Sequence, residues 1–202
     1  MMERKLVGLV LAIFGLMLWA GPAAATPAGT VVEVSGSATD HGRVLNRGET
    51  AQIGDTLDVP PGGNLKLQMA DGSVISLAPD STMTVASYSI DSPGRDVRLF
   101  LTRGALRAQV TSGTGPSTFE VSTAGGTASV DSAPADWFIK AQPDSAQVGV
   151  LAGTIDLRSA VTGESVSIPA RWGTRLEKGL DPVLPRVWLQ REFNAVIRLT
   201  GA

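Results

Sequence analysis

The sequence predicts an all-β fold, with a solenoid-like or jelly-roll-like body of short strands followed by a C-terminal amphipathic helix. The first observation is the abundance of turn residues, with 23 Gly and 12 Pro in 202 residues, placed between β-branched and apolar segments. The second is the alternation of apolar and polar residues within these segments, which is the period of a half-buried strand. The third is a change to helical spacing near the C-terminus. A hydrophobic content of 43% is sufficient for a buried core.

The segment from Gly54 to Ser81 carries the clearest strand signal. An Asp71-Gly72 turn joins two alternating strands, of which the first is Asn64–Met69 and the second follows within Ala70–Ser81. Asp-Gly between alternating apolar residues is a strong signal for a β-hairpin. We therefore expect the apolar residues of the first strand to face the core and its polar residues, such as Lys66, to face solvent.

Further strands are expected along the rest of the chain. They are placed at Thr30–Val34, Thr56–Val59, Thr82–Ser87, Val97–Leu101, Phe119–Ser122, Ala128–Asp131, Trp137–Ala141, Val148–Leu151 and Ser165–Ile168. Two strands that follow a glycine, at Gly104 and Gly153, are similar to each other and suggest repeated hairpin units. A solenoid-like body and a jelly-roll sandwich both accommodate this pattern.

The C-terminal segment, residues 181–202, differs from the β body that is expected over residues 26–180. After two Pro-containing breakers, apolar residues recur at helical spacing from Val187 to Leu199, namely Leu189, Phe193, Val196 and Ile197. This pattern predicts an amphipathic helix. The helix either covers an open end or face of the β body, because exposed sheet edges are usually protected, or it docks a partner.

The N-terminus predicts export from the cytoplasm. A basic start at Met1–Lys5 precedes an apolar stretch, Leu6–Ala20, and the small residues Ala23–Ala25. This is the pattern of a cleavable signal peptide over residues 1–25, with cleavage between Ala25 and Thr26. The apolar stretch is shorter than the roughly 20 residues of a membrane span. We expect a periplasmic or secreted mature protein without a stable membrane span.

Charge and cysteine content exclude some classes of protein. The 17 basic and 19 acidic residues give a net charge of −2, which lacks the electrostatic footprint of a nucleic-acid-binding protein. With no cysteine, the chain has neither disulfides nor the lipid-modified cysteine of a bacterial lipoprotein. Stability must therefore come from packing and from hydrogen bonds between strands.

No catalytic or metal-binding constellation is recognisable in the sequence. His41 is the single histidine, and it lies in a polar turn beside Gly42, where a surface position is the simplest interpretation. A Gly-x-Ser-x-Gly nucleophile motif is absent. Most Asp residues stand beside Gly, Pro or Ser, where Asp usually bonds its own backbone in turns. The sequence predicts no enzyme, no cofactor and no metal site.

Aromatic and basic residues near the C-terminus are the candidates for partner contact. Trp172 lies between Arg171 and Arg175 in a Gly-containing segment, which suits either a protein hot spot or an anionic glycan. Trp188 and Phe193 belong to the expected helix and are the candidates if that helix docks a partner. For each tryptophan the alternative is an ordinary position in the core.

The residues of the hairpin region also resemble a known family. Gly54-Asp55-x-Leu57, Gly62-Gly63-x-Leu65-x-Leu67, Asp71-Gly72-Ser73-x-Ile75-x-Leu77 and Pro79-x-Ser81, in this order, resemble the FecR domain of bacterial envelope signalling proteins. The resemblance extends from about Thr30 to Lys178 and includes the two strands after Gly104 and Gly153. It implies an all-β periplasmic domain of the kind that takes part in transmitting envelope signals to a sigma factor.

The chain departs from those regulators in its N-terminal region. A signal peptide precedes the β body here, where the regulators have a cytoplasmic segment that holds the sigma factor and a membrane helix. We therefore expect a stand-alone, non-enzymatic FecR-like module that binds another envelope protein, with a role in envelope signalling. The alternative is a structural or glycan-binding protein of the cell envelope, with cell-wall glycan as its ligand.

Overall fold

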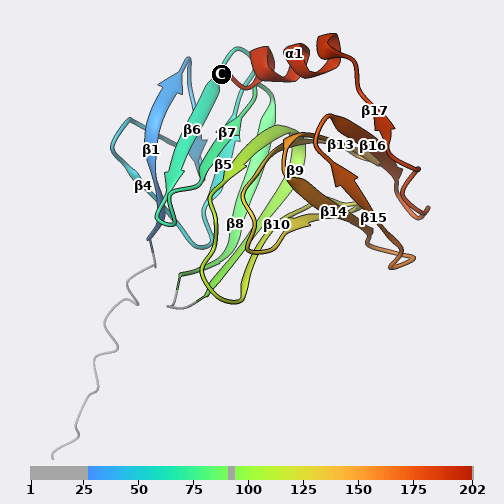
Figure 1. Cartoon of the computed structure of the whole chain (residues 1–202). Helices are drawn as coiled ribbons and strands as arrows, with labels where there is room; N and C mark the ends of the chain where they lie inside the picture. Colours follow the sequence, from blue (N-terminus) through green and yellow to red (C-terminus); the bar gives the residue numbers. More distant parts are fainter. Residues whose placement is uncertain (1–26, 91–93, 202) are drawn as a thin grey trace, which may run out of the picture.

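The computed structural model describes residues 27–90 and 94–201. The all-β prediction and the C-terminal helix are confirmed (Figure 1). The expected signal peptide, residues 1–25, lies outside the described residues. Within these residues, no helix combines the length and the apolar character that crossing a membrane requires.

The described chain consists of short strands followed by one helix. The strands are β1 (Pro27–Ser35), β2 (Thr39–Asp40), β3 (Arg43–Val44), β4 (Thr50–Gln52), β5 (Thr56–Val59), β6 (Asn64–Met69), β7 (Val74–Leu77), β8 (Ser81–Ser89), β9 (Arg95–Val110), β10 (Ser117–Ser122), β11 (Gly126–Val130), β12 (Ala135–Gln142), β13 (Ser145–Ala152), β14 (Thr154–Ser159), β15 (Ser165–Pro169), β16 (Trp172–Glu177) and β17 (Arg186–Val187), and the helix is α1 (Gln190–Leu199).

The strands pair into one mixed, open sheet that folds into two layers. Sheet A has the order β4-β1-β6-β7-β9-β12-β13-β16-β17, with antiparallel neighbours throughout. Sheet B has the order β3-β2-β5-β8-β9-β10-β11-β14-β15, and its β9–β10 pair is parallel. The edge strands of sheet A are therefore β4 and β17.

Strand β9 connects the layers because it belongs to both sheets. Its first part pairs with β8 and β10 in sheet B, and its second part pairs with β7 and β12 in sheet A. Between these parts Gly104 has a φ of +86°. A Cβ on Gly104 would lie 2.5 Å from the carbonyl oxygen of Asp80 and 2.5 Å from the Cα of Ser81, so the bend brings two backbones into close contact.

A second bend connects β13 in sheet A to β14 in sheet B. Gly153 lies at this bend with a φ of +81°, and a Cβ there would lie 2.6 Å from the carbonyl oxygen of Pro134. The two glycine-led segments that resemble each other in sequence thus occupy equivalent bends. The directions differ, since β9 passes from sheet B to sheet A and β13–β14 passes from sheet A to sheet B.

One hydrophobic core lies between the two layers. Apolar side chains of alternate positions are buried, as the period of two predicts, and Trp137, Phe119 and Met83 are among the largest that are fully buried. In β6 the buried positions are Leu65, Leu67 and Met69, as expected. Two facing layers over a shared core correspond to a sandwich arrangement.

The helix begins three residues later than the hydrophobic spacing predicts. Val187 belongs to β17, where it pairs with Trp172, and α1 starts at Gln190. Leu189 was expected on the buried face of the helix, but it is 51% exposed because it precedes the first turn. Glu192 supports the helix start, since its carboxylate accepts a hydrogen bond from the backbone N–H of Leu189 at 2.7 Å.

Candidate functional site

The predicted aromatic residues Trp188 and Phe193 attach α1 to the outer face of sheet A. Trp188 is 4% exposed and Phe193 is 3% exposed, and both pack with Phe138 of β12 in a small apolar cluster separate from the main core. The ring centroid of Trp188 lies 5.2 Å from the ring centroid of Phe138 and 5.6 Å from that of Phe193. Their side chains therefore pack inside the molecule, and α1 covers part of a sheet face.

Two glycines in the sheet make room for the Trp188 ring. A Cβ on Gly173 of β16 would lie 2.2 Å from the indole nitrogen, and a Cβ on Gly149 of β13 would lie 3.2 Å from the same indole. These residues are paired directly across the two strands. The sheet therefore carries a shallow depression without side chains, into which the tryptophan fits.

Arg171 and Trp172 lie beside the start of the helix. Arg171, at the turn before β16, donates a hydrogen bond to the side chain of Gln190 at 3.2 Å, and its guanidinium lies 6.0 Å from the Phe193 ring centroid. The backbone N–H of Trp188 donates to the carbonyl of Arg171 at 3.0 Å. Four of the five predicted partner residues are thus neighbours, namely Arg171, Trp172, Trp188 and Phe193.

Arg175, the fifth candidate, lies further along β16 and points to the outer face of sheet A. Its guanidinium forms an ion pair of 2.6 Å with Glu177. Both side chains are about half exposed, so the pair contributes little to stability. Arg175 remains accessible from solvent.

A group of exposed apolar residues lies in β16 and in the segment that follows it, at the edge of sheet A. We call it the edge surface and define it as Trp172, Leu180, Val183, Leu184, Val187 and Leu189, which are between 37% and 82% exposed. Val187 pairs with Trp172, and the backbone N–H of Val183 donates to the carbonyl of Arg175 at 3.0 Å. These two contacts hold the segment along the strand.

From the sequence, Trp172 is the member of the edge surface that is a candidate for partner contact. Val187 and Leu189 belong to the expected helix, and Leu184 belongs to a Pro-containing breaker. A usable signal is present, because Leu180, Val183, Leu184 and Val187 lie within eight residues that also contain two prolines and two charged residues. Exposed apolar groups that lie together, unlike scattered single ones, mark interaction sites.

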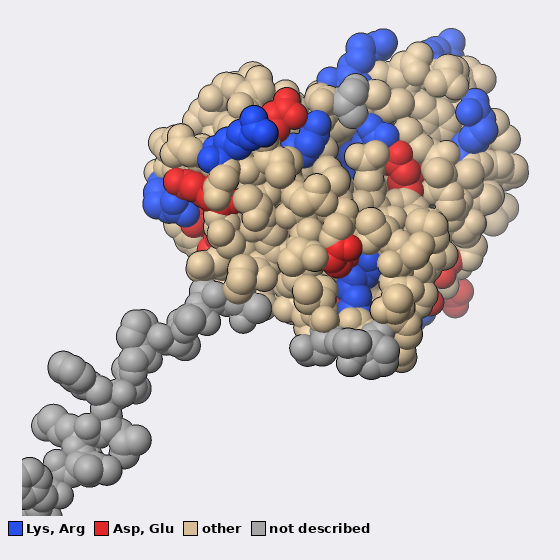
Figure 2. All heavy atoms as spheres, turned by 60° about the vertical axis from the view of Figure 1, so that its left-hand side comes forward, with Lys and Arg blue, Asp and Glu red and all other residues tan. Residues whose placement is uncertain are grey.

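Charge is distributed unevenly between the body and this C-terminal part. Residues 170–202 contain six Lys and Arg against three Asp and Glu, whereas residues 27–169 contain nine against fifteen. Figure 2 shows that on one face of the described residues both signs are scattered over a surface that is mostly uncharged. The edge surface thus belongs to the positively charged end of a molecule that carries net negative charge elsewhere.

Arg186 and Glu192 form the best-defined ion pair of this region. They lie 2.6 Å apart, and hydrogen bonding to Arg186 is the largest effect that lowers the pKa of the Glu192 carboxyl. The same bond raises the pKa of Arg186. The pair connects β17 to the first turn of α1 and is exposed to solvent, so it orients the segment more than it stabilises the fold.

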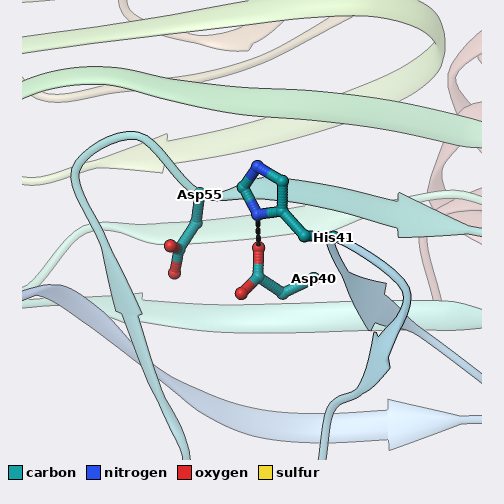
Figure 3. A group of neighbouring side chains, drawn as sticks. All are labelled: Asp40, His41 and Asp55. Atoms are coloured by element: carbon teal, nitrogen blue, oxygen red, sulfur yellow. Dashed lines mark hydrogen bonds and ion pairs between the residues drawn. The ribbon is translucent and has the colours of Figure 1, made fainter.

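Asp40, His41 and Asp55 form the candidate metal cluster of the described residues (Figure 3). The Nδ1 of His41 lies 2.8 Å from the Oδ1 of Asp40, while Asp55 accepts a hydrogen bond from the backbone N–H of Gln52 at 2.8 Å. The guanidinium of Arg43 lies 3.5 Å from the other oxygen of Asp40. Both carboxylates already have protein partners, so the turn hydrogen bonds account for the cluster.

A buried ion pair fixes the Asp71-Gly72 turn. The Nη1 of Arg95 lies 2.8 Å from the Oδ2 of Asp71, and their side chains are 4% and 8% exposed. Arg95 also donates to the carbonyls of Thr111 and Asp131, and the Tyr88 hydroxyl accepts from the backbone N–H of Asp71 at 2.6 Å. The sequence placed Asp71 in a turn but gave no indication of this partner. The network ties three loops together and has a structural role.

These features define a two-layer β domain whose most distinctive residues lie in turns and bends. The family model described as FecR protein matches residues 55–156, which include the Asp71-Gly72 turn and both glycine bends. Because this match covers half of the sequence, the chain belongs to the FecR family. The edge surface and α1 lie beyond the matched residues.

Two solved structures with a similar fold share one description and one organism. Two crystal structures, at 1.65 Å and 2.50 Å resolution, are of a "putative anti-sigma factor" from Parabacteroides distasonis ATCC 8503. Each superposes with a TM-score of 0.57 at 17% and 16% identity, over 70% of this chain. The matched part spans 64% and 63% of the two solved chains, so the likeness concerns the fold of less than two thirds of each. Curated protein sequences yield no match.

Proposed function

We propose that this FecR-family chain is an exported, non-enzymatic module of the cell envelope that binds another envelope protein through the edge surface. The observation that carries the proposal is the group of exposed apolar side chains along β16 and β17, of which Leu184 is 82% exposed. Soluble proteins seldom expose several neighbouring apolar side chains unless these side chains form a binding site.

Three further features support a protein partner. Trp172 and the arginines around it, Arg171 and Arg186, belong to the residue types that dominate protein-binding hot spots. The family and the fold relationship to a protein named as a putative anti-sigma factor support a role in signalling across the envelope. The N-terminal signal-peptide pattern supports a periplasmic location, where such a partner would be met.

Site-specific photo-crosslinking in the native envelope tests this proposal. A photoreactive amino acid is placed at Leu184 or Val187, and at Val44 as the matched control. Val44 is 58% exposed and lies in β3, at the opposite end of sheet B from β14 and β15. We expect a single crosslinked protein from the first two positions and none from the third.

A double variant, Leu184→Asp with Val187→Thr, serves as the control for loss of binding. It removes two apolar contacts while Thr keeps a β-branched side chain in β17. We expect the crosslink introduced at Leu189 to disappear in this background. Equal crosslinking from Val44 would overturn the proposal. Recovery of the chain with the cell-wall fraction and no protein adduct would overturn it in favour of a glycan-binding role.

A further inference from the structure

A groove follows one side of α1, between the helix and the part of sheet A that it leaves uncovered. Its volume is about 390 Å³, and its walls include Ala195, Val196 and Leu199 from the helix and Lys140 and Gln147 from the sheet. A polar hollow of about 170 Å³ shares Lys140 and Gln147 with the groove and extends toward Arg175. The two spaces therefore adjoin at Lys140 and Gln147, with the apolar part on the helix side and the polar part toward Arg175.

Strand register explains the floor of this site. Lys140 of β12 pairs with Ala105 of β9 on one side and with Gln147 of β13 on the other, and Gln147 pairs with Arg175 of β16. The neighbours of Lys140 along β12, Ile139 and Ala141, are buried in the core. Because successive residues of a strand point to opposite faces, the paired residues form one row on the outer face.

Lys140 carries the uncompensated charge of the groove. Glu192, which also lines it, is held by Arg186 at 2.6 Å, and Arg175 is held by Glu177 at 2.6 Å. Among the described residues, Lys140 is exposed and has no hydrogen bond or ion pair through its ammonium group. An anionic group in the groove would meet one free positive charge and the side-chain amide of Gln147.

The apolar part of the groove suits aliphatic side chains. Its aromatic residues, Phe138 and Trp188, are 1% and 4% exposed, so neither ring offers a face on which a sugar could stack. The accessible apolar groups belong to the helix, where Leu199 is 39% exposed, Ala195 is exposed and Val196 is half-buried. These groups offer aliphatic surface beside a single cation.

We propose that this groove binds a short peptide segment of a partner protein, with aliphatic side chains against Val196 and Leu199 and one carboxylate on Lys140. The carboxylate would be an Asp or Glu side chain within two residues of the aliphatic ones, because Lys140 and Leu199 line the same groove. This site is separate from the edge surface and goes beyond the function proposed above.

Selection from a phage-displayed library of random heptapeptides tests the assignment, with the full chain recovered from the bacterial envelope as bait. Two variants disable the groove by different means. Lys140→Glu reverses its charge, and Ala195→Phe fills its apolar part from an exposed helix position. The matched controls are Arg158→Glu, which reverses an exposed charge on β14 in sheet B, and Asn194→Phe, on an exposed helix position outside the groove lining.

We expect the selected peptides to contain one acidic residue close to Leu, Ile or Val. Their affinity should fall about five- to tenfold with Lys140→Glu and about tenfold or more with Ala195→Phe. It should change less than about twofold with either control and with the Leu184→Asp and Val187→Thr double variant. Unchanged affinity in the double variant would show that the groove binds peptide independently of the edge surface.

Three outcomes would overturn the assignment. One is a failure to enrich any peptide, and another is enrichment of peptides without an acidic position. The third is equal affinity for the wild type, Lys140→Glu and Ala195→Phe. Thermal unfolding of each variant is recorded alongside, and Ala195→Gln replaces Ala195→Phe as the steric variant if the larger side chain loosens the helix.

Discussion

At the scale of single residues, the most constrained polar groups lie behind the Asp71-Gly72 turn. Arg95 and Asp71 are buried together, and Tyr88 approaches the backbone of the same turn. Burying two charges is costly, and removing one partner would leave the other unpaired, which typically costs about 3–5 kcal/mol. Asp71 of the Asp-Gly-Ser pattern thus has a structural role that a hairpin signal alone does not indicate.

The hydroxyl of Tyr88 makes this network sensitive to alkaline pH. Desolvation by burial, followed by the charge of Asp71, raises the pKa of Tyr88 to about 12. Because the folded state keeps a proton that the unfolded chain loses near its ordinary pKa of about 10, stability is complete below about pH 10 and declines toward pH 12. The decline from this group cannot exceed about 1.4 kcal/mol per pH unit.

Tyrosinate absorbance measures this effect directly because the chain contains one tyrosine. We expect ionisation of Tyr88 near pH 12 in the folded protein and near pH 10 in urea. Urea unfolding at several alkaline pH values should show the matching loss of stability. In the Tyr88→Phe variant, the part of this loss that comes from ionisation of the tyrosine hydroxyl should be absent. Ionisation at the ordinary pKa in the folded protein would contradict the burial of the hydroxyl.

At the scale of elements, the two glycine bends determine where the chain passes from one sheet to the other. Gly104 must hold a positive φ and also leave space for the backbone of Asp80 and Ser81. The sequence could indicate a glycine-led strand at this position. It could not indicate that the same strand continues for 16 residues through both sheets, because each half has an ordinary period of two.

A substitution of Gly104 by alanine tests this account. The positive φ costs about 1–2 kcal/mol for any residue with a Cβ, and the contact with Ser81 and the Asp80 carbonyl adds to it. We expect Gly104→Ala to lower the free energy of unfolding by more than about 3 kcal/mol in urea titrations. Gly163→Ala, at a positive φ of 77° in open space, should cost only about 1 kcal/mol.

The helix illustrates what periodicity can and cannot predict. The spacing of Phe193 and Val196 correctly gave an amphipathic helix, and both side chains contribute to the cluster on sheet A. The start was wrong because Val187 fits a strand as well as a helix, and its pairing with Trp172 decided the outcome. In the structure, α1 covers part of one face of sheet A, and a groove beside the helix remains open.

At the scale of the whole molecule, the sequence predicted the fold class and the turn chemistry because both depend on local patterns. The partition into two sheets and the Arg95–Asp71 pair depend on contacts between distant residues, which no local pattern encodes. The same limit applies to the candidate site. Trp172 stood out by its residue type, whereas the edge surface exists only because the segment after Lys178 folds back along β16.

The edge surface carries a prediction about the stability of the whole molecule. If these apolar residues serve binding, then replacing them should leave the fold unchanged, since exposed substitutions usually alter stability by less than about 0.5 kcal/mol. Burial of the same side chains in a core would instead contribute about 1.5–3 kcal/mol each. The double variant Leu184→Asp and Val187→Thr distinguishes these cases because Leu184 is 82% and Val187 is 55% exposed.

We expect this double variant to unfold within about 4 °C of the wild type, because two changes of at most about 0.5 kcal/mol each sum to about 1 kcal/mol, which shifts the midpoint by about 2–4 °C in a domain of this size. Binding of a hydrophobic dye such as anilinonaphthalene sulfonate should decrease at the same time, and so should self-association at high protein concentration. Val44→Asp, which removes a single exposed apolar side chain from β3 in the other layer, should leave dye binding unchanged. A large fall in the unfolding temperature would instead mean that the segment after β16 contributes to the core, and the edge surface would lose its standing as a binding site.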